Sequence, residues 1–60
     1  MFPMSYIFPF TLKGVAAALK WIDDDADPFE VFLQLCMGQQ WKAGPFHFIV
    51  GDDWRIHVRR

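Results

Sequence analysis

The sequence predicts a small single-domain α+β protein with the element order β-α-α-β-β. Apolar residues recur with the period of an α-helix in residues 11–22 and 27–37. They alternate with the period of a β-strand in residues 46–58. The 60 residues are 53% hydrophobic and 18% aromatic, which favours one folded domain over disorder. We therefore expect an antiparallel helical hairpin packed on a C-terminal β-hairpin, with an N-terminal segment that can add a third strand.

Residues 1–10 are expected to form an extended arm or an edge strand. The segment from Ser5 to Phe10 is rich in aromatic and β-branched residues, as strands are. Pro9 has no N–H group to donate to a neighbouring strand, which confines such a strand to the edge of a sheet. The segment contains no basic residue and precedes no small-residue cleavage site, so we do not expect a secretory signal peptide.

The first helix is expected at residues 11–22. Thr11 is a suitable N-cap, and Phe10 and Val15 have the spacing of a hydrophobic staple. Gly14 should weaken the helix by roughly 1 kcal/mol relative to alanine. The acidic residues 23–25 oppose the negative end of the helix dipole and should end the helix. The short linker that follows favours an antiparallel second helix.

The second helix, residues 27–37, has more apolar surface than one small core can cover. Asp27 can cap the start of this helix, and Pro28 fits its first position. Gly38 suits the left-handed backbone conformation that commonly ends a helix. Two polar residues four positions apart form one narrow stripe, so apolar side chains cover about two-thirds of the helix. The sequence leaves open which half faces the core: Phe29, Leu33 and Cys36, or Val31, Phe32 and Leu35.

Residues 46–58 are expected to form a β-hairpin with the three-residue loop Gly51-Asp52-Asp53. The expected pairs are Val50–Trp54, Phe48–Ile56 and Phe46–Val58 on an apolar face, with His47–His57 and Ile49–Arg55 on the other face. Residues 39–45 before the hairpin are expected to form a loop, with Trp41 as its large apolar residue and Gly44-Pro45 as its breaker.

The sequence carries no motif of catalysis or cofactor binding. Its one serine lies in the apolar N-terminal segment, and it lacks a glycine-rich phosphate loop. We therefore expect neither an enzyme nor a cofactor. A metal site is also not expected, because His47 and His57 offer two ligands where zinc takes three or four. The acidic run 23–27 lacks the spacing of a calcium loop.

Cys36 is expected to be a small buried hydrophobic residue. A lone cysteine excludes an internal disulfide and suits a reducing compartment, and the net charge of −1 gives no general attraction to an anionic membrane. The second helix is about half the length that crosses a bilayer. We expect a cytoplasmic protein without membrane contact.

The apolar surplus of the second helix predicts a protein-protein interaction module, either a homodimer or one half of a complex with another protein. The expected anchors are Phe29, Phe32, Met37 and Trp41, because aromatic residues and methionine are enriched at interface cores. A short chain without motifs is typical of proteins with which phages or mobile elements inhibit or regulate a host protein. That origin is a hypothesis from size and composition.

The alternative is a DNA-binding regulator that uses the basic C-terminal hairpin. The residues available for anion or nucleic-acid contact are Arg55, His57, Arg59 and Arg60. Residues 11–19, Thr-Leu-Lys-Gly-Val-Ala-Ala-Ala-Leu, resemble the first helix of helix-turn-helix proteins such as phage excisionases, which implies a small winged helix. The apolar second helix speaks against this alternative, because a recognition helix needs polar side chains for base edges.

Overall fold

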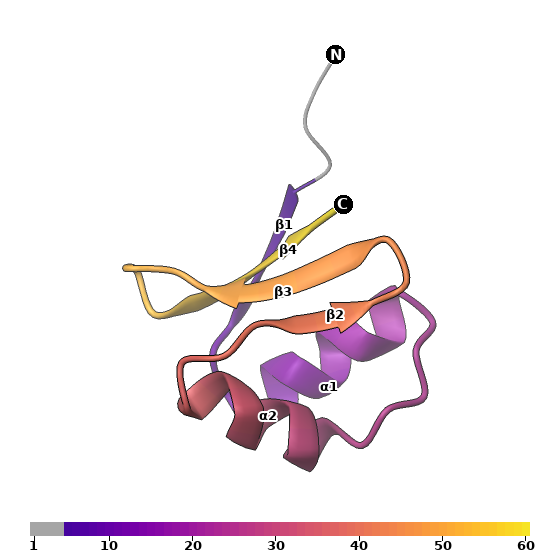
Figure 1. Cartoon of the computed structure of the whole chain (residues 1–60), viewed down its shortest axis with the longest axis horizontal. Helices are drawn as coiled ribbons and strands as arrows, with labels where there is room; N and C mark the ends of the chain where they lie inside the picture. Colours follow the sequence, from indigo (N-terminus) through magenta and orange to yellow (C-terminus); the bar gives the residue numbers. More distant parts are fainter. Residues whose placement is uncertain (1–4) are drawn as a thin grey trace.

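The computed structural model describes residues 5–60 and shows two helices packed on one face of a four-stranded antiparallel sheet (Figure 1). The elements in chain order are β1 (Ser5–Pro9), α1 (Leu12–Trp21), α2 (Pro28–Cys36), β2 (Trp41–Ala43), β3 (Phe46–Val50) and β4 (Arg55–Arg59). The order of strands in the sheet is β1-β4-β3-β2. The α+β class and the helical hairpin on a sheet are confirmed, with one strand more than expected.

The N-terminal strand is confirmed as an edge strand. β1 pairs antiparallel with β4, so that Tyr6 lies opposite Val58 and Pro9 lies opposite Arg55. Residues 1–4 of the expected arm lie outside the described residues. Because β1 covers one side of β4 and β3 covers the other, β4 is a central strand and its hairpin with β3 is not a free wing.

α1 begins as expected, and the structure explains its glycine. The Gly14 N–H donates a hydrogen bond to the Thr11 hydroxyl at 2.9 Å. A Cβ at Gly14 would collide with the carbonyl oxygen of Pro9, the last residue of β1. The glycine therefore allows a close approach between helix and strand, a benefit that its low helix propensity does not reveal.

α2 also begins and ends as expected, with an Asp27 carboxylate accepting the Phe29 N–H at 3.1 Å and Gly38 at φ 78°. Its packing settles the alternative that the sequence left open. Val31 and Leu35 are buried and Phe32 is half-buried, so that half of the helix faces the core. The other half, with Phe29, Leu33 and Cys36, is exposed. The expectation of a buried Cys36 is therefore wrong.

The expectation of a loop throughout residues 39–45 is wrong, because β2 lies within it. Trp41 pairs with Phe48, and Ala43 pairs with Phe46, across a turn formed by Gly44 and Pro45. Gly44 has φ 59°, as a tight two-residue hairpin turn with glycine in its first position requires. The Gly-Pro pair thus marks a hairpin turn rather than the end of an irregular loop.

The hairpin of β3 and β4 has the expected loop length and a different register. The loop is 52–54, closed by the Gly51 N–H, which donates to the Arg55 carbonyl oxygen at 2.9 Å. The observed pairs are Val50–Ile56, Phe48–Val58, Ile49–His57 and His47–Arg59, so the expected Val50–Trp54, Phe48–Ile56, Ile49–Arg55 and His47–His57 pairs are wrong. A shift of two positions leaves the side chains of β3 and β4 on their expected faces, and for this reason apolar alternation did not reveal it. Trp54, which was expected on the apolar face, lies instead in the loop and is exposed.

The hydrophobic core lies between the helices and the sheet. Its buried residues are Val15, Ala18, Leu19, Val31, Leu35, Phe48, Ile56 and Val58. Phe8, Phe10 and Phe32 pack against it from the rim, with the rings of Phe10 and Phe32 5.2 Å apart. The core therefore uses one side of each element and leaves the outer side of α2 and the far face of the sheet open.

Candidate functional site

The exposed half of α2 carries a continuous apolar stripe. Phe29, Leu33 and Met37 follow one another at intervals of four residues, so they lie on one side of the helix. They are 55%, 45% and 69% exposed. We call these three residues the helix stripe. Leu12 of α1 extends it, because Leu12 and Phe29 line one shallow apolar depression between the starts of the two helices.

The structure does not bring the four expected anchors into one surface. Phe29 and Met37 lie in the helix stripe. Phe32 and Trp41 pack against the core of their own chain, and the Trp41 Nε1 atom is buried without a hydrogen-bond partner among the described residues. Leu33 is the stripe residue that was not named as an anchor, because its place depended on which half of the helix faces the core.

Acidic residues lie at the N-terminal end of the helix stripe. They are Asp23, Asp24, Asp25, Asp27 and Glu30. Part of this run is structural, since an Asp24 carboxylate oxygen accepts the Ala26 N–H at 2.8 Å and Asp27 caps α2. The C-terminal end of α2 carries no acidic residue. Acidic residues therefore border the helix stripe at one end only.

The far face of the sheet is basic. Side chains alternate between the two faces of a strand, and those of Ala43, Phe48, Ile56 and Val58 point to the core. The alternate positions carry Lys42, His47, Arg55, His57 and Arg59, which we call the basic sheet face. Neither helix covers this face (Figure 1).

The register arranges three of these side chains in a row across the sheet. Lys42 lies opposite His47, and His47 lies opposite Arg59. The two charged residues of this row, Lys42 and Arg59, therefore lie on either side of His47, about 10 Å apart across two strand intervals. In the next row His57 lies between Ile49 and Ile7.

The structure brings together three of the four basic residues named from sequence: Arg55, His57 and Arg59. Arg60 is separate, because its guanidinium lies 5.9 Å from the centre of the Phe46 ring. Lys42 was missed because its strand was expected to be a loop. The signal that could have found it is the Gly-Pro turn after Ala43, which pairs Lys42 with His47.

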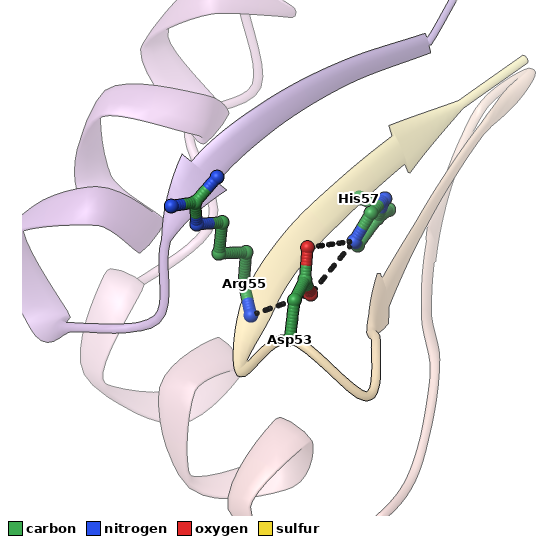
Figure 2. Close-up of polar contacts among 3 residues, drawn as sticks. All are labelled: Asp53, Arg55 and His57. Carbon is green, nitrogen blue, oxygen red and sulfur yellow. Dashed lines mark hydrogen bonds and ion pairs between the residues drawn. The ribbon is translucent and has the colours of Figure 1, made fainter.

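A hydrogen bond between two side chains fixes the end of the basic sheet face near the hairpin loop (Figure 2). The His57 Nε2 lies 3.0 and 3.2 Å from the two Asp53 carboxylate oxygens, and it carries the proton because a carboxylate only accepts. This hydrogen bond lowers the pKa of Asp53 below its ordinary value of 3.8. A Cβ at Gly51 would lie 2.7 Å from the same His57 nitrogen, so glycine leaves room for the pair.

The loop beside this pair presents an exposed tryptophan. Trp54 is 75% exposed and has φ 59°. The left-handed region is an outlier for a bulky residue and costs of order 1–3 kcal/mol. Trp54 takes the position that glycine or asparagine usually fills in such a loop, and it directly precedes Arg55 of the basic sheet face.

Other kinds of site find little support in residues 5–60. No three histidine, cysteine, aspartate or glutamate side chains among them lie close enough to hold a metal ion. Neither helix of this part of the chain has the length and apolar character needed to cross a membrane. No protein-family model, curated protein or solved structure matches the chain.

Proposed function

We propose that the chain is a non-catalytic protein-interaction module that docks the helix stripe onto a partner, and that a second copy is its simplest partner. The observation that carries the proposal is the exposure of Phe29, Leu33 and Met37 on one side of α2. Single exposed apolar residues are ordinary, but a contiguous apolar patch on a small domain is typical of an interaction site. The acidic run would form its polar rim.

The charges favour an antiparallel dimer. Two parallel copies of α2 would place both acidic runs together, which costs like-charge repulsion. Two antiparallel copies would keep the two acidic runs at opposite ends of the interface, each near an α2 C-terminus that has no acidic residue. This arrangement also opposes the two helix dipoles favourably.

The size of the stripe sets the expected affinity. Complete burial of a phenylalanine, leucine or methionine side chain contributes about 1.5–3 kcal/mol, and the side chains of the stripe and Leu12 are 44–69% exposed. They would thus contribute about 4 kcal/mol from each copy, or about 8 kcal/mol in the dimer, which lies within the roughly 4–15 kcal/mol that association costs. We therefore expect a weak dimer, seen at high micromolar concentration.

Light scattering over a range of concentrations tests the proposal. The wild-type mass should rise toward twice that of one chain, whereas the Phe29→Asp variant should remain monomeric. The matched control is Trp54→Asp, which places the same charge at an exposed aromatic residue outside the stripe. A Phe32→Asp variant is unsuitable, because Phe32 packs against the core. A monomeric wild type at every concentration, or a dimer that survives Phe29→Asp, would overturn the self-association proposal.

The exposed Cys36 tests the orientation of the two helices. Cys36 lies at the C-terminal end of α2, so an antiparallel dimer holds the two thiols apart and a parallel dimer brings them together. Disulfide formation by the wild type should be no faster under mild oxidation than for the Phe29→Asp variant. Rapid disulfide formation that depends on Phe29 would contradict the antiparallel arrangement.

The cellular role of such a module stays a proposal from size and composition. Inhibition or regulation of a host protein by a phage or mobile-element chain in the cytoplasm suits a small domain with one apolar docking stripe. In that role the partner would offer an apolar groove with a basic rim, complementary to the acidic run.

Nucleic-acid binding is the second candidate function, because Arg55, His57 and Arg59 share one open face with Lys42 and His47. The surface differs from the winged helix that the sequence suggested. The hairpin lies in the middle of the sheet, and the exposed side of α2 offers apolar rather than base-reading side chains.

A further inference from the structure

We infer that the basic sheet face, together with Trp54, binds single-stranded nucleic acid. This inference rests on the second candidate function and is independent of the helix stripe. It combines three separate observations: an open sheet face with spaced cations, a charge distribution that confines acidic residues near that face to the hairpin loop, and an exposed aromatic side chain in the same loop.

The spacing of the cations suits a chain of phosphates. Arg55 and Arg59 lie four residues apart on β4, which at about 3.3 Å per residue places them about 13 Å apart along the strand. Lys42 and His47 extend the Arg59 end across two neighbouring strands that lie about 4.8 Å apart. The basic side chains therefore follow β4 and, at its C-terminal end, continue across the sheet to β3 and β2. Several phosphates of one nucleic-acid strand can contact them together.

The acidic residues do not cancel this charge. The acidic run, residues 23–27 with Glu30, belongs to the helical layer, which covers the opposite face of the sheet. The acidic residues nearest the basic sheet face are Asp52 and Asp53 of the hairpin loop, which line one depression with His57 and Arg59. The Asp53 carboxylate is hydrogen-bonded to His57, which leaves Asp52 as one charge against the three of Lys42, Arg55 and Arg59. Arg55 and Arg59 are exposed and form no ion pair among the described residues.

Trp54 favours a single strand over a duplex or an acidic protein. Proteins that bind single strands combine a positively charged surface with aromatic side chains on which unpaired bases stack. Trp54 is an exposed ring held by a strained backbone at the residue before Arg55. Duplex bases are already stacked, and this face of the sheet carries no helix that could enter the major groove. An acidic protein surface would use the cations and has no base to stack on the ring.

Fluorescence anisotropy of a labelled twelve-residue oligothymidine, compared with a duplex of equal length, tests the inference. The single strand should bind more tightly than the duplex. Replacing both arginines, Arg55→Ala with Arg59→Ala, should weaken binding at least ten-fold and reduce the salt slope of log K by about 1.4. The control, Lys13→Ala with Lys20→Ala, removes the same charge from the helical layer and should leave binding unchanged.

Trp54→Ala should weaken single-strand binding by about five-fold or more with little change in the salt slope, since it removes stacking and no charge. Circular dichroism confirms that each variant is folded. Equal affinity for duplex and single strand overturns the single-strand inference and keeps the second candidate function. Absence of binding to either nucleic acid overturns both. Equally tight binding of an oligoglutamate, or unchanged binding by the arginine variant, also overturns the inference.

Discussion

The two outer faces of this domain differ in the interactions that they can make with a partner. The outer side of the helical layer is apolar along α2 and acidic at its rim, whereas the open side of the sheet is basic with a few aliphatic residues between the cations. Each face uses residues that the core does not need. A chain of 60 residues can thus keep two chemically opposite surfaces, because one layer of core separates them.

The close contact between the helical layer and the sheet at Gly14 should give the largest effect on stability. Gly14→Ala should lower the free energy of unfolding by about 3 kcal/mol or more, because its Cβ would meet the Pro9 carbonyl oxygen and force α1 away from β1. Urea denaturation measures the effect. The control is Ala17→Gly on the exposed side of the same helix, which should cost about 1 kcal/mol. A Gly14→Ala variant as stable as the wild type would refute the close approach.

The two halves of α2 give the next largest contrast. Phe32→Ala should cost about 2 kcal/mol, because Phe32 packs against the core and against Phe10. Phe29→Ala, which removes the same atoms from the exposed half, should change stability of the monomer by no more than about 0.5 kcal/mol. Thermal denaturation at low concentration compares the two variants. Equal costs would contradict the assignment of one half to the core.

The strain at Trp54 predicts a smaller effect of the opposite sign. Trp54→Asn should raise the free energy of unfolding by about 0.5–1 kcal/mol, because asparagine tolerates the left-handed region better. Gly44→Ala should lower it by about 1 kcal/mol for the same reason, since Gly44 has φ 59° in open space. Both values come from urea denaturation. If Trp54→Asn stabilises the fold and also weakens nucleic-acid binding, the wild-type tryptophan lowers stability while its exposed ring contributes to binding.

The smallest effect is the pH dependence of the Asp53–His57 pair. The hydrogen bond from His57 holds the pKa of Asp53 below 3.8, so the pair stabilises the folded state above that pH. This stabilisation is lost as pH falls through the lowered pKa of the folded state. Carboxyl NMR titration should show Asp53 titrating below its ordinary range, and His57→Phe or Gly51→Ala should return it toward 3.8. An unchanged Asp53 titration in both variants would show that the pair does not form in solution.

Local signals in the sequence predicted the helices and the faces of the strands. Thr11 and Asp27 cap the helices as expected, and apolar alternation assigned the inner face of β3 and β4. These features depend on residues close in sequence, whose capping and periodicity have few alternatives. The fold class followed from them because two amphipathic helices need a sheet to cover.

Contacts between distant residues could not be predicted in the same way. The close approach of Gly14 to Pro9 depends on the angle between two elements, and a glycine within a helix shows only its cost. The hairpin register depends on Trp54 adopting a conformation that its side chain disfavours. With this register His57 lies opposite Ile49 rather than His47, and Arg59 lies opposite His47. The sequence therefore could not predict which side chains of the basic sheet face are neighbours.

The central claim, that the helix stripe is an interaction surface, is tested most directly by NMR on dilution. Amide spectra of the labelled wild type at high and low micromolar concentration give a residue-by-residue map of self-association. We expect concentration-dependent amide shifts confined to Leu12, Phe29, Leu33 and Met37 with their neighbours. These shifts should be absent in the Phe29→Asp variant. Spectra that do not change with concentration, or shifts confined to the open face of the sheet, would contradict the claim.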